Sequence, residues 1–487
     1  MERIWRKNKA LTSVVLLMAL IAGLVVWYSL AGSDDESPPV IIYLVDTLRA
    51  DRLGAYGYPV PTSPTIDELA SDSVLFEQVY APAPWTVPSV ASMNTSSFLC
   101  EHGLLSERHQ LDPKIKTLPQ RLTDAGYLTL GRVQQGMAGA MTGLDRGFSI
   151  FKESTNPWAK IGSSVETLLE RSWDGEALYL YIHTNEPHDP YWTPREFQRN
   201  FGHFSIDKLV AYNKTYRLYR RLTGEHWTKQ QPLGTVDNSA GQQAEASKLE
   251  ALNADISLLY DASVQWADSN LADVIRRLKR IGLWDKAIFI FLSDHGEEFG
   301  EHGGWFHEQS VYEEQLRVPL IIHFPDTAHA GLRIDAPVSL LDIMPTIFDF
   351  IGKRDFCSDC RGQSLLPLIS GEKYTRTADP TVFAVRDDVR NFHKQWSKTR
   401  GNKNVVLRIG DRKLIWNIES DQFEFYDLSS DPEEKNNLAF AQDHSAKQIR
   451  EKIKIWWNDC VANGYRFLSP EDMDQEKIDK LRSLGYL

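Results

Sequence analysis

The chain has 487 residues, 42% of them apolar and 11% aromatic, and a formal net charge of −12. Such a composition can form a large core, which argues against global disorder, and the negative charge argues against non-specific nucleic-acid binding. The length suits one large α/β domain with a smaller companion, or two to three ordinary domains.

The N-terminal segment has the charge pattern of a membrane anchor. Four basic residues near the start precede an uncharged stretch from Ala10 to Ser33, and three acidic residues follow it. Its apolar part, about 20 residues, matches a helix that crosses a bilayer. Basic residues before it and acidic residues after it predict a cytoplasmic N-terminus and a periplasmic or extracellular body. We therefore predict a single-pass anchor in residues 1–33; the alternative, a cleaved signal peptide, also exports the body.

Apolar runs of strand length alternate with helical patterns along the body. The runs cover residues 40–45, 177–183, 287–293 and 318–324, and the helical patterns cover 64–73, 117–126 and 249–281. Runs this apolar are typical of strands buried on both faces. The alternation predicts an α/β fold, a layered sheet flanked by helices with much parallel pairing.

Three of these strands end in side chains that can bind a metal ion. Asp46 follows the first run, His183 ends the second, and Asp294 and His295 follow the third. Any one of them alone is more often a solvated loop residue or a turn cap. Because parallel strands present their carboxyl ends at one edge, we expect the four to converge there. Carboxylate and imidazole groups suit one divalent ion, and Ca, Mg, Mn and Zn all remain open.

Thr86 stands at the predicted first turn of a helix, directly after a Pro-Trp loop. A threonine there is commonly only a helix cap. However, its hydroxyl also faces the positive end of the helix dipole, which is a natural anion site. A metal ion could activate that hydroxyl without a neighbouring base. We therefore predict Thr86 as the nucleophile and as a further metal ligand.

Two later segments differ from this pattern. A basic, tyrosine-bearing segment in 195–245 is either a lid for an anionic substrate or a solvated helix that packs its tyrosines on the body. After about residue 380 the pattern changes to antiparallel strands with polar turns. We predict a catalytic domain in 34–379 and a small C-terminal α+β subdomain in 380–487.

The sequence contains four cysteines, and an exported body permits disulfides. Cys357 and Cys360 favour a local structural bridge over a redox pair or half of a zinc site, because a second Cys-x-x-Cys is missing. The sequence does not indicate a role for Cys100 or Cys460.

A series of sequence blocks between about residues 40 and 440 occurs in the order of a known family. The blocks read VDTLRADRLGAYGYPVPTSPTIDELA, WTVPSVASMNTS with EHG, YIHTNEPHDPY, LSDHGEEFGEHG, YEEQLRVPLII and YDLSSDPEEKNNLA. They resemble the sulfatase family of the alkaline phosphatase superfamily. The resemblance implies an alkaline-phosphatase-like core with a C-terminal subdomain, and metal-dependent chemistry on sulfate or phosphate esters, carried for example by a glycan or a lipid.

The resemblance also implies roles by motif position. Thr86 falls at the place of the nucleophile, and His188 resembles the histidine of the substrate or leaving group. The implied metal ligands are Asp46, Asp294 and His295, and His302 and His307 fall near the residues that surround the anion.

Three departures from the family pattern bear on the chemistry. Thr86 replaces the cysteine that becomes formylglycine, Val90 replaces an arginine, and Thr47 replaces the second acid of an Asp-Asp pair. The aldehyde hydrate of formylglycine can expel sulfate from a covalent intermediate, whereas a threonine sulfate needs water attack at sulfur. A threonine phosphate can be resolved by in-line attack at phosphorus. Phosphoethanolamine and phosphoglycerol transferases resemble the threonine pattern.

We therefore expect an exported, membrane-anchored hydrolase of a sulfuric or phosphoric ester, with one divalent ion and Thr86 as the nucleophile. A transferase that modifies an envelope glycan or lipid is the first alternative. A non-catalytic anion-binding member of the fold is the second, and the loss of the arginine and of one acid motivates it.

Overall fold

The computed structural model describes residues 37–202, 252–372, 381–387, 403–438 and 444–464, except residues 108, 135, 155, 157–159 and 192. The chain divides into two units, Met1–Pro38 and Pro39–Leu487, and every element below belongs to the second. The predicted anchor and most of the predicted lid segment lie outside the described residues. Within the described ranges, no helix is long and apolar enough to cross a bilayer.

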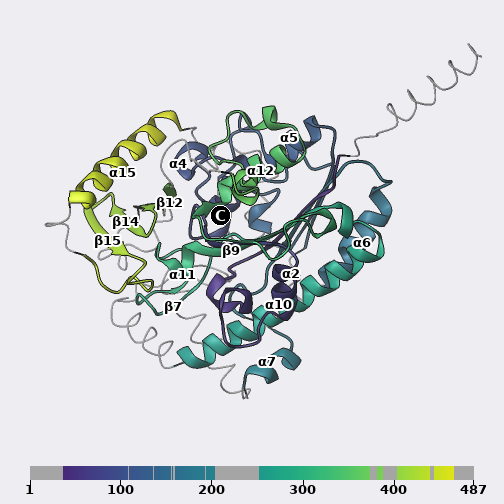
Figure 1. The fold of residues 1–487 in the computed structure, drawn as a ribbon, viewed down its shortest axis with the longest axis horizontal. Coiled ribbons are helices and arrows are strands. Elements are labelled where there is room, and N and C mark those ends of the chain that lie inside the picture. The colour runs from purple at the N-terminus through teal and green to yellow at the C-terminus, as the bar shows by residue number, and fades with distance from the viewer. Residues whose placement is uncertain are drawn as a thin grey trace, which may run out of the picture. The chain divides into compact units, whose positions relative to one another are not determined.

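A nine-stranded mixed sheet forms the centre of the unit, in the order β10-β2-β9-β6-β1-β5-β3-β4, and β11 also pairs with β2 (Figure 1). The strands are β1 (Val40–Val45), β2 (Val74–Tyr80), β3 (Leu128–Val133), β4 (Ile150–Glu153), β5 (Leu178–Thr184), β6 (Ile288–Ser293), β9 (Arg317–His323), β10 (Arg333–Ile334) and β11 (Val338–Ser339). β1 runs parallel to both β5 and β6, and its last residue, Val45, lies beside Thr184 and Ser293. The ends of these three strands are therefore flush. β9 runs antiparallel to β2 and β6, so the sheet is mixed.

Helices cover both faces of this sheet (Figure 1). One face packs on α2 (Pro64–Ser71), α6 (Ile161–Ser172) and α10 (Asn253–Arg280), and the other packs on α3 (Thr86–Thr95), α5 (Leu118–Asp124) and α12 (Ile343–Phe350). In β1, alternate residues enter the two cores, Ile41 and Tyr43 on one side and Ile42 and Leu44 on the other. This two-sided burial explains why the strand is uniformly apolar.

The C-terminal part contains a second, antiparallel sheet in the order β12-β13-β14-β15. Its strands are β12 (Thr381–Asp387), β13 (Lys403–Ile409), β14 (Arg412–Asn417) and β15 (Gln422–Asp427), followed by α15 (His444–Asn463). A disulfide between Cys100, in α4 (Leu99–His102), and Cys460 ties α15 to the rest of the unit. A second disulfide joins Cys357 to Cys360, which confirms the predicted local bridge.

Three short elements complete the surroundings of the site. Strands β7 (Glu298–Phe299) and β8 (Trp305–Phe306) form a small hairpin just after β6, and α11 (Glu313–Leu316) leads into β9. This hairpin determines where the histidines of the segment 295–307 point. One further short helix, α7 (Arg195–Phe201), contacts α10.

Candidate active site

The carboxyl ends of β1 and β6 bring together three potential metal ligands. One ligand atom from each of Asp46, Asp294 and His295 lies within 4.8 Å of the other two, and all three residues are fully buried. The flush register of the strands produces this meeting, because each side chain belongs to the first or second residue after its strand.

Backbone groups fix the orientation of these ligands. Asp294 Oδ1 accepts hydrogen bonds from the N–H groups of Thr47 (3.2 Å) and His295 (2.9 Å), whereas Oδ2 has no hydrogen-bond partner in the described part of the chain. His295 Nδ1 lies 2.9 Å from the carbonyl oxygen of Gly296, which can only accept, so Nδ1 carries the proton. The unprotonated Nε2 then faces Asp46 Oδ1 at 3.5 Å and Asp294 Oδ2 at 3.6 Å.

The loop after β1 is held in a strained conformation. Thr47 has a φ of 56°, a left-handed value that a β-branched residue rarely adopts. The Tyr260 hydroxyl of α10 donates to the Thr47 carbonyl at 2.7 Å and accepts from the Arg49 N–H at 2.9 Å. This clamp holds the Thr47 N–H against Asp294, so the strain is part of the arrangement that orients the ligand.

The donor set fits a divalent cation. Two carboxylates and a neutral imidazole are ordinary ligands for such an ion, and Asp294 Oδ2 is a buried acceptor without a donor. Burial raises the pKa of Asp294 to about 7, with a smaller contribution from Asp46, and burial lowers the pKa of His295 to about 4. The site therefore buries the Asp294 carboxylate with no donor to its Oδ2 in the described part of the chain, and a bound cation would supply a compensating charge there.

Thr86 lies against this group as the first residue of α3. Its side chain is almost fully buried, and Oγ1 lies 3.2 Å from His295 Nε2 and 3.5 Å from Asp46 Oδ1. Ser89, one turn later, donates to the Asp294 carbonyl at 2.6 Å and ties the helix to the strand end. The structure thus brings Thr86 to the three acid and histidine ligands, at the N-terminus of a helix as predicted.

A second group of titratable side chains adjoins the first. His188, Asp189 and His307 also offer ligand atoms within 4.8 Å of one another. His188 Nδ1 donates to the Asp189 carbonyl at 2.7 Å, and His307 Nδ1 lies 3.0 Å from Glu297 Oε1. The His307 ring lies 4.7 Å from that of His188 and 4.9 Å from that of His295, so the two groups are contiguous.

His302 has its contacts elsewhere. Its Nδ1 lies 2.7 Å from Glu314 Oε1, its Nε2 lies 3.3 Å from the Glu434 carbonyl, and its ring stacks on Tyr312 at 3.7 Å. The hairpin between Phe299 and Trp305 separates it from the rim that holds the other histidines. The structure therefore brings His307 to His188 and His295 but directs His302 toward the C-terminal part.

Three further residues belong to the site. His183, which was expected to end its strand, is the next-to-last residue of β5; it lies 4.0 Å from Asp46 (Nε2 to Oδ2), and burial lowers its pKa to about 3. Asp189 and Glu297 orient His188 and His307 and were not predicted. A signal for them was present, because each acid lies within two positions of a predicted histidine in a quoted block.

Comparison with known proteins agrees with this geometry. Residues 38–353 match the family described as Sulfatase, and residues 300–459 match N-sulphoglucosamine sulphohydrolase, C-terminal. The first match spans more than half of the chain, so the chain belongs to the sulfatase family. It is 24% identical to an N-acetylglucosamine-6-O-sulfatase of Bacteroides thetaiotaomicron, over 87% of this chain and 86% of the relative. An arylsulfatase of Clostridium perfringens is 23% identical, over 84% and 92%.

Solved structures show the same fold. A structure in complex with its substrate, D-glucosamine-2-N,6-O-disulfate, has a TM-score of 0.65 at 20% identity and covers 90% of this chain and 99% of that chain. A phosphonate monoester hydrolase of Agrobacterium radiobacter has a TM-score of 0.65 at 19% identity, with coverages of 87% and 95%. Family membership identifies the chain as a hydrolase of sulfuric or phosphoric esters, in a family that generally uses a divalent ion.

Proposed function

We propose that the chain hydrolyses a sulfuric ester on an anionic glycan and that Thr86 is the nucleophile. The observation that carries the proposal is the position of Thr86 Oγ1, within 3.5 Å of both Asp46 and His295 at the N-terminus of α3. The sugar part of the substrate is supported by the N-acetylglucosamine-6-O-sulfatase relative and by the structural neighbour that binds a glucosamine disulfate.

Asp46, Asp294 and His295 are the residues that would hold the divalent ion. When bound there, the ion would neutralise charge on the ester oxygens and lower the pKa of a hydroxyl group. The remaining functions fall to the protein. The backbone N–H groups of Thr47 and His295 keep Asp294 oriented, and Ser89 keeps the start of α3 against the strand end.

The side chains present account for both halves of the reaction. Thr86 Oγ1 forms a bond to the sulfur of the ester, and its proton passes to the Asp46 carboxylate, whose Oδ1 lies 3.5 Å away. The alcohol oxygen leaves and takes a proton from His188, whose positive charge is stabilised by Asp189 Oδ1 at 3.2 Å from Nδ1. Water then attacks the sulfur and gives a proton to His188, the bond between Thr86 and sulfur breaks, sulfate leaves, and Thr86 Oγ1 takes its proton back from Asp46.

Phosphoryl chemistry is the second candidate, and one observation favours it. Thr86 stands where the family places the formylglycine precursor, and a threonine ester of phosphate is resolved more readily by in-line attack than one of sulfate. The structural likeness to a phosphonate monoester hydrolase is compatible with this candidate. Transfer of the phosphoryl-type group to a glycan or lipid acceptor, instead of water, would give a modified acceptor as the product.

We also propose that residues 1–33 anchor the enzyme and that its body lies outside the cytoplasm. The basic-apolar-acidic order of the segment supports this location. The two disulfides support it independently, because such bonds persist mainly in oxidising compartments.

Intact-mass spectrometry tests the role of Thr86. The full-length chain would be incubated briefly with aryl sulfate and aryl phosphate esters, beside Thr86→Ala, Thr86→Ser and the control Thr95→Ala in the same helix. We expect an adduct that maps to position 86 in the unsubstituted chain, none in Thr86→Ala, and retention in Thr95→Ala. After proteolysis, high mass resolution on the peptide that contains position 86 separates a sulfuryl from a phosphoryl group. Full turnover by a folded, metal-loaded Thr86→Ala chain would contradict the proposal.

A further inference from the structure

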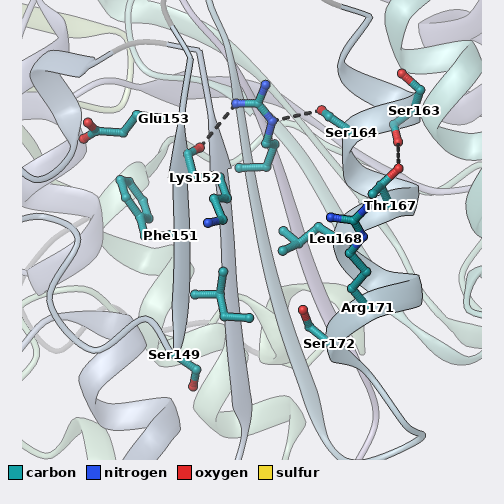
Figure 2. Close-up of a pocket in the computed structure, with 12 residues that line it drawn as sticks. Ser149, Phe151, Lys152, Glu153, Ser163, Ser164, Thr167, Leu168, Arg171 and Ser172 are labelled. Carbon is teal, nitrogen blue, oxygen red and sulfur yellow. Dashed lines mark hydrogen bonds between the residues drawn. The ribbon is translucent and has the colours of Figure 1, made fainter.

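A cavity of about 910 Å³ lies at the edge of the central sheet, and none of the candidate active-site residues lines it. Strand β4, the last strand of the sheet, and helix α6 form its walls, and Arg132 of β3 reaches into it. Figure 2 shows the labelled side chains of Ser163, Ser164, Thr167, Leu168, Arg171 and Ser172 along the helix, opposite Lys152 of the strand.

Three cations line this cavity without acidic partners. Arg132 is only 8% exposed; its Nε donates to Ser164 Oγ at 2.9 Å, and Nη1 donates to the carbonyls of Val133 and Lys152 at 3.0 and 3.3 Å. No carboxylate in the described ranges pairs with Arg132, Lys152 or Arg171, and Arg132 Nη2 makes no hydrogen bond there. A buried guanidinium without a counter-charge is costly, and burial lowers its pKa.

Glu153 also lines the cavity, but the carboxylate groups of the acids closest in sequence have their contacts elsewhere. Glu153 follows Lys152 on β4, so its side chain lies on the opposite face of the strand, where it accepts from the Ala140 N–H at 2.8 Å. Figure 2 shows Glu153 on the far side of β4 from the helix. Glu166 of α6 pairs with Arg277 and Arg280 of α10. The cavity therefore keeps an excess positive charge in a chain of net charge −12.

The hydroxyl groups of α6 complement these cations. Ser163 Oγ donates to the Lys160 carbonyl at 3.1 Å, Ser164 Oγ to that of Ile161 at 2.8 Å, and Thr167 Oγ1 to that of Ser163 at 2.9 Å. Since each proton is used within the helix, the Ser163 and Thr167 oxygens keep lone pairs that can accept from a ligand, while Ser164 Oγ already accepts from Arg132 Nε. Cations next to hydrogen-bond acceptors suit a molecule that carries both anionic esters and hydroxyl groups.

We propose that this cavity is a second binding site for a sulfated glycan, in which Arg132, Lys152 and Arg171 hold a sulfate group and the α6 hydroxyl oxygens accept from sugar hydroxyls. The strand register links it to the catalytic edge, since Arg132 lies beside Ile182 and the next pair is Val133 with His183. A polymer with several sulfate groups could thus be held outside the site where one ester is cleaved. The identity of the ligand rests on the proposed function.

Binding measured without turnover tests this site. The full-length chain with Thr86→Ala would be titrated calorimetrically with a heparin-derived hexasaccharide and with its desulfated form. Adding Lys152→Gln and Arg171→Gln should weaken binding of the sulfated form at least about tenfold, because two charge-assisted contacts are lost. The control pair Lys114→Gln and Lys286→Gln removes the same charge from exposed positions elsewhere and should change the affinity little.

Turnover separates this proposal from the proposed function. With Thr86 present, Lys152→Gln with Arg171→Gln should leave the hydrolysis of a small aryl ester unchanged, since neither residue lies at the catalytic edge. Equal hexasaccharide affinity with and without the cavity substitutions would overturn the second site, as would equal weakening by the control pair or no binding of the sulfated form. Loss of Thr86-dependent turnover alone would overturn only the catalytic proposal. Arg132→Lys should weaken binding less than Arg132→Gln if the cavity recognises an anion.

Discussion

Two clusters of buried charged residues differ in how their charges are balanced. The rim group, Asp46, Asp294 and His295, faces inward with Asp294 Oδ2 lacking a donor within the described chain. The Lys413 group, in contrast, is paired internally: Lys413 Nζ lies 3.0 Å from Glu313 and 2.8 Å from Glu434. Burial alone would lower the pKa of Lys413, but Glu434 and Glu313 raise it above its usual value.

This difference distinguishes a cluster with a structural role from a cluster with a functional role. The Lys413 group joins β14 of the C-terminal sheet to α11, which leads into β9 of the central sheet, and needs nothing from outside. In the rim group, by contrast, Asp294 Oδ2 has no donor in the described part of the chain, and a bound cation would fill that place. Burial of charge is therefore not diagnostic by itself, and the presence or absence of an internal counter-charge is the informative observation.

The largest effect should come from breaking the paired cluster. Lys413→Met leaves Glu313 and Glu434 buried without a partner, and we expect a loss of about 3–5 kcal/mol in the free energy of unfolding. Chemical denaturation measures it. Lys435→Met, which removes an exposed lysine paired with Glu433, is the matched control and should leave the free energy of unfolding nearly unchanged. Equal stability of both variants would show that the paired cluster is not structural.

Removing a charge from the rim group should affect turnover and not stability. Asp294→Asn removes a ligand and should reduce turnover by at least about 10²–10³-fold, the scale of one lost electrostatic contact in an active site. Without metal, the Asp294→Asn chain should be no less stable than the unsubstituted chain, because the substitution removes a buried carboxylate that has no counter-charge. Metal analysis, turnover and melting in a chelator measure the three quantities. Chelation of the unsubstituted chain should abolish turnover, and full activity in the chelator would contradict the metal assignment.

Removing the disulfide that ties α15 to the rest of the unit should have a smaller effect on stability. Replacing Cys100 and Cys460 by serine opens a loop with a sequence separation of 360 and should cost about 2–4 kcal/mol. Replacing Cys357 and Cys360, separated by three positions, should cost less, because a short loop constrains the unfolded chain less. Denaturation of the two double variants measures the difference, and both variants should retain the metal. A greater loss for the short bridge would contradict the loop-length argument.

The sequence was sufficient for the parts of the fold that depend on apolar runs. Strands β1, β5 and β6 are buried on both faces, so their residues and their shared carboxyl edge were predictable, and Asp46, Asp294 and His295 followed from that edge. Antiparallel β9 was less predictable, because a short apolar run does not show its direction.

The rest depended on chain reversals and long-range contacts. His302 and His307 are five positions apart, and the β7–β8 hairpin sends them to different clusters, which no periodicity could show. The pairing of Cys100 with Cys460 similarly depends on how α15 packs near α4. Motif position alone predicted that both histidines lie near the anion. In the structure, only His307 lies beside the rim group.

The smallest effect concerns His302 and its dependence on pH. Burial alone would lower the pKa of His302, but the hydrogen bond and the charge of Glu314 raise it above its usual value. A raised pKa in the folded state means that the stabilisation is complete below about pH 6.5, the pKa of histidine in the unfolded chain, and is lost as the pH rises through the pKa of the folded state.

The stability difference between the unsubstituted chain and His302→Gln should therefore shrink from pH 6 toward pH 8. The change should stay within about 1 kcal/mol because the group is partly exposed. Denaturation at several pH values measures it, and His329→Gln, at an exposed histidine, is the control. If His302→Gln instead abolishes turnover at constant stability, the histidine acts with the rim group, and the division between the two clusters is wrong.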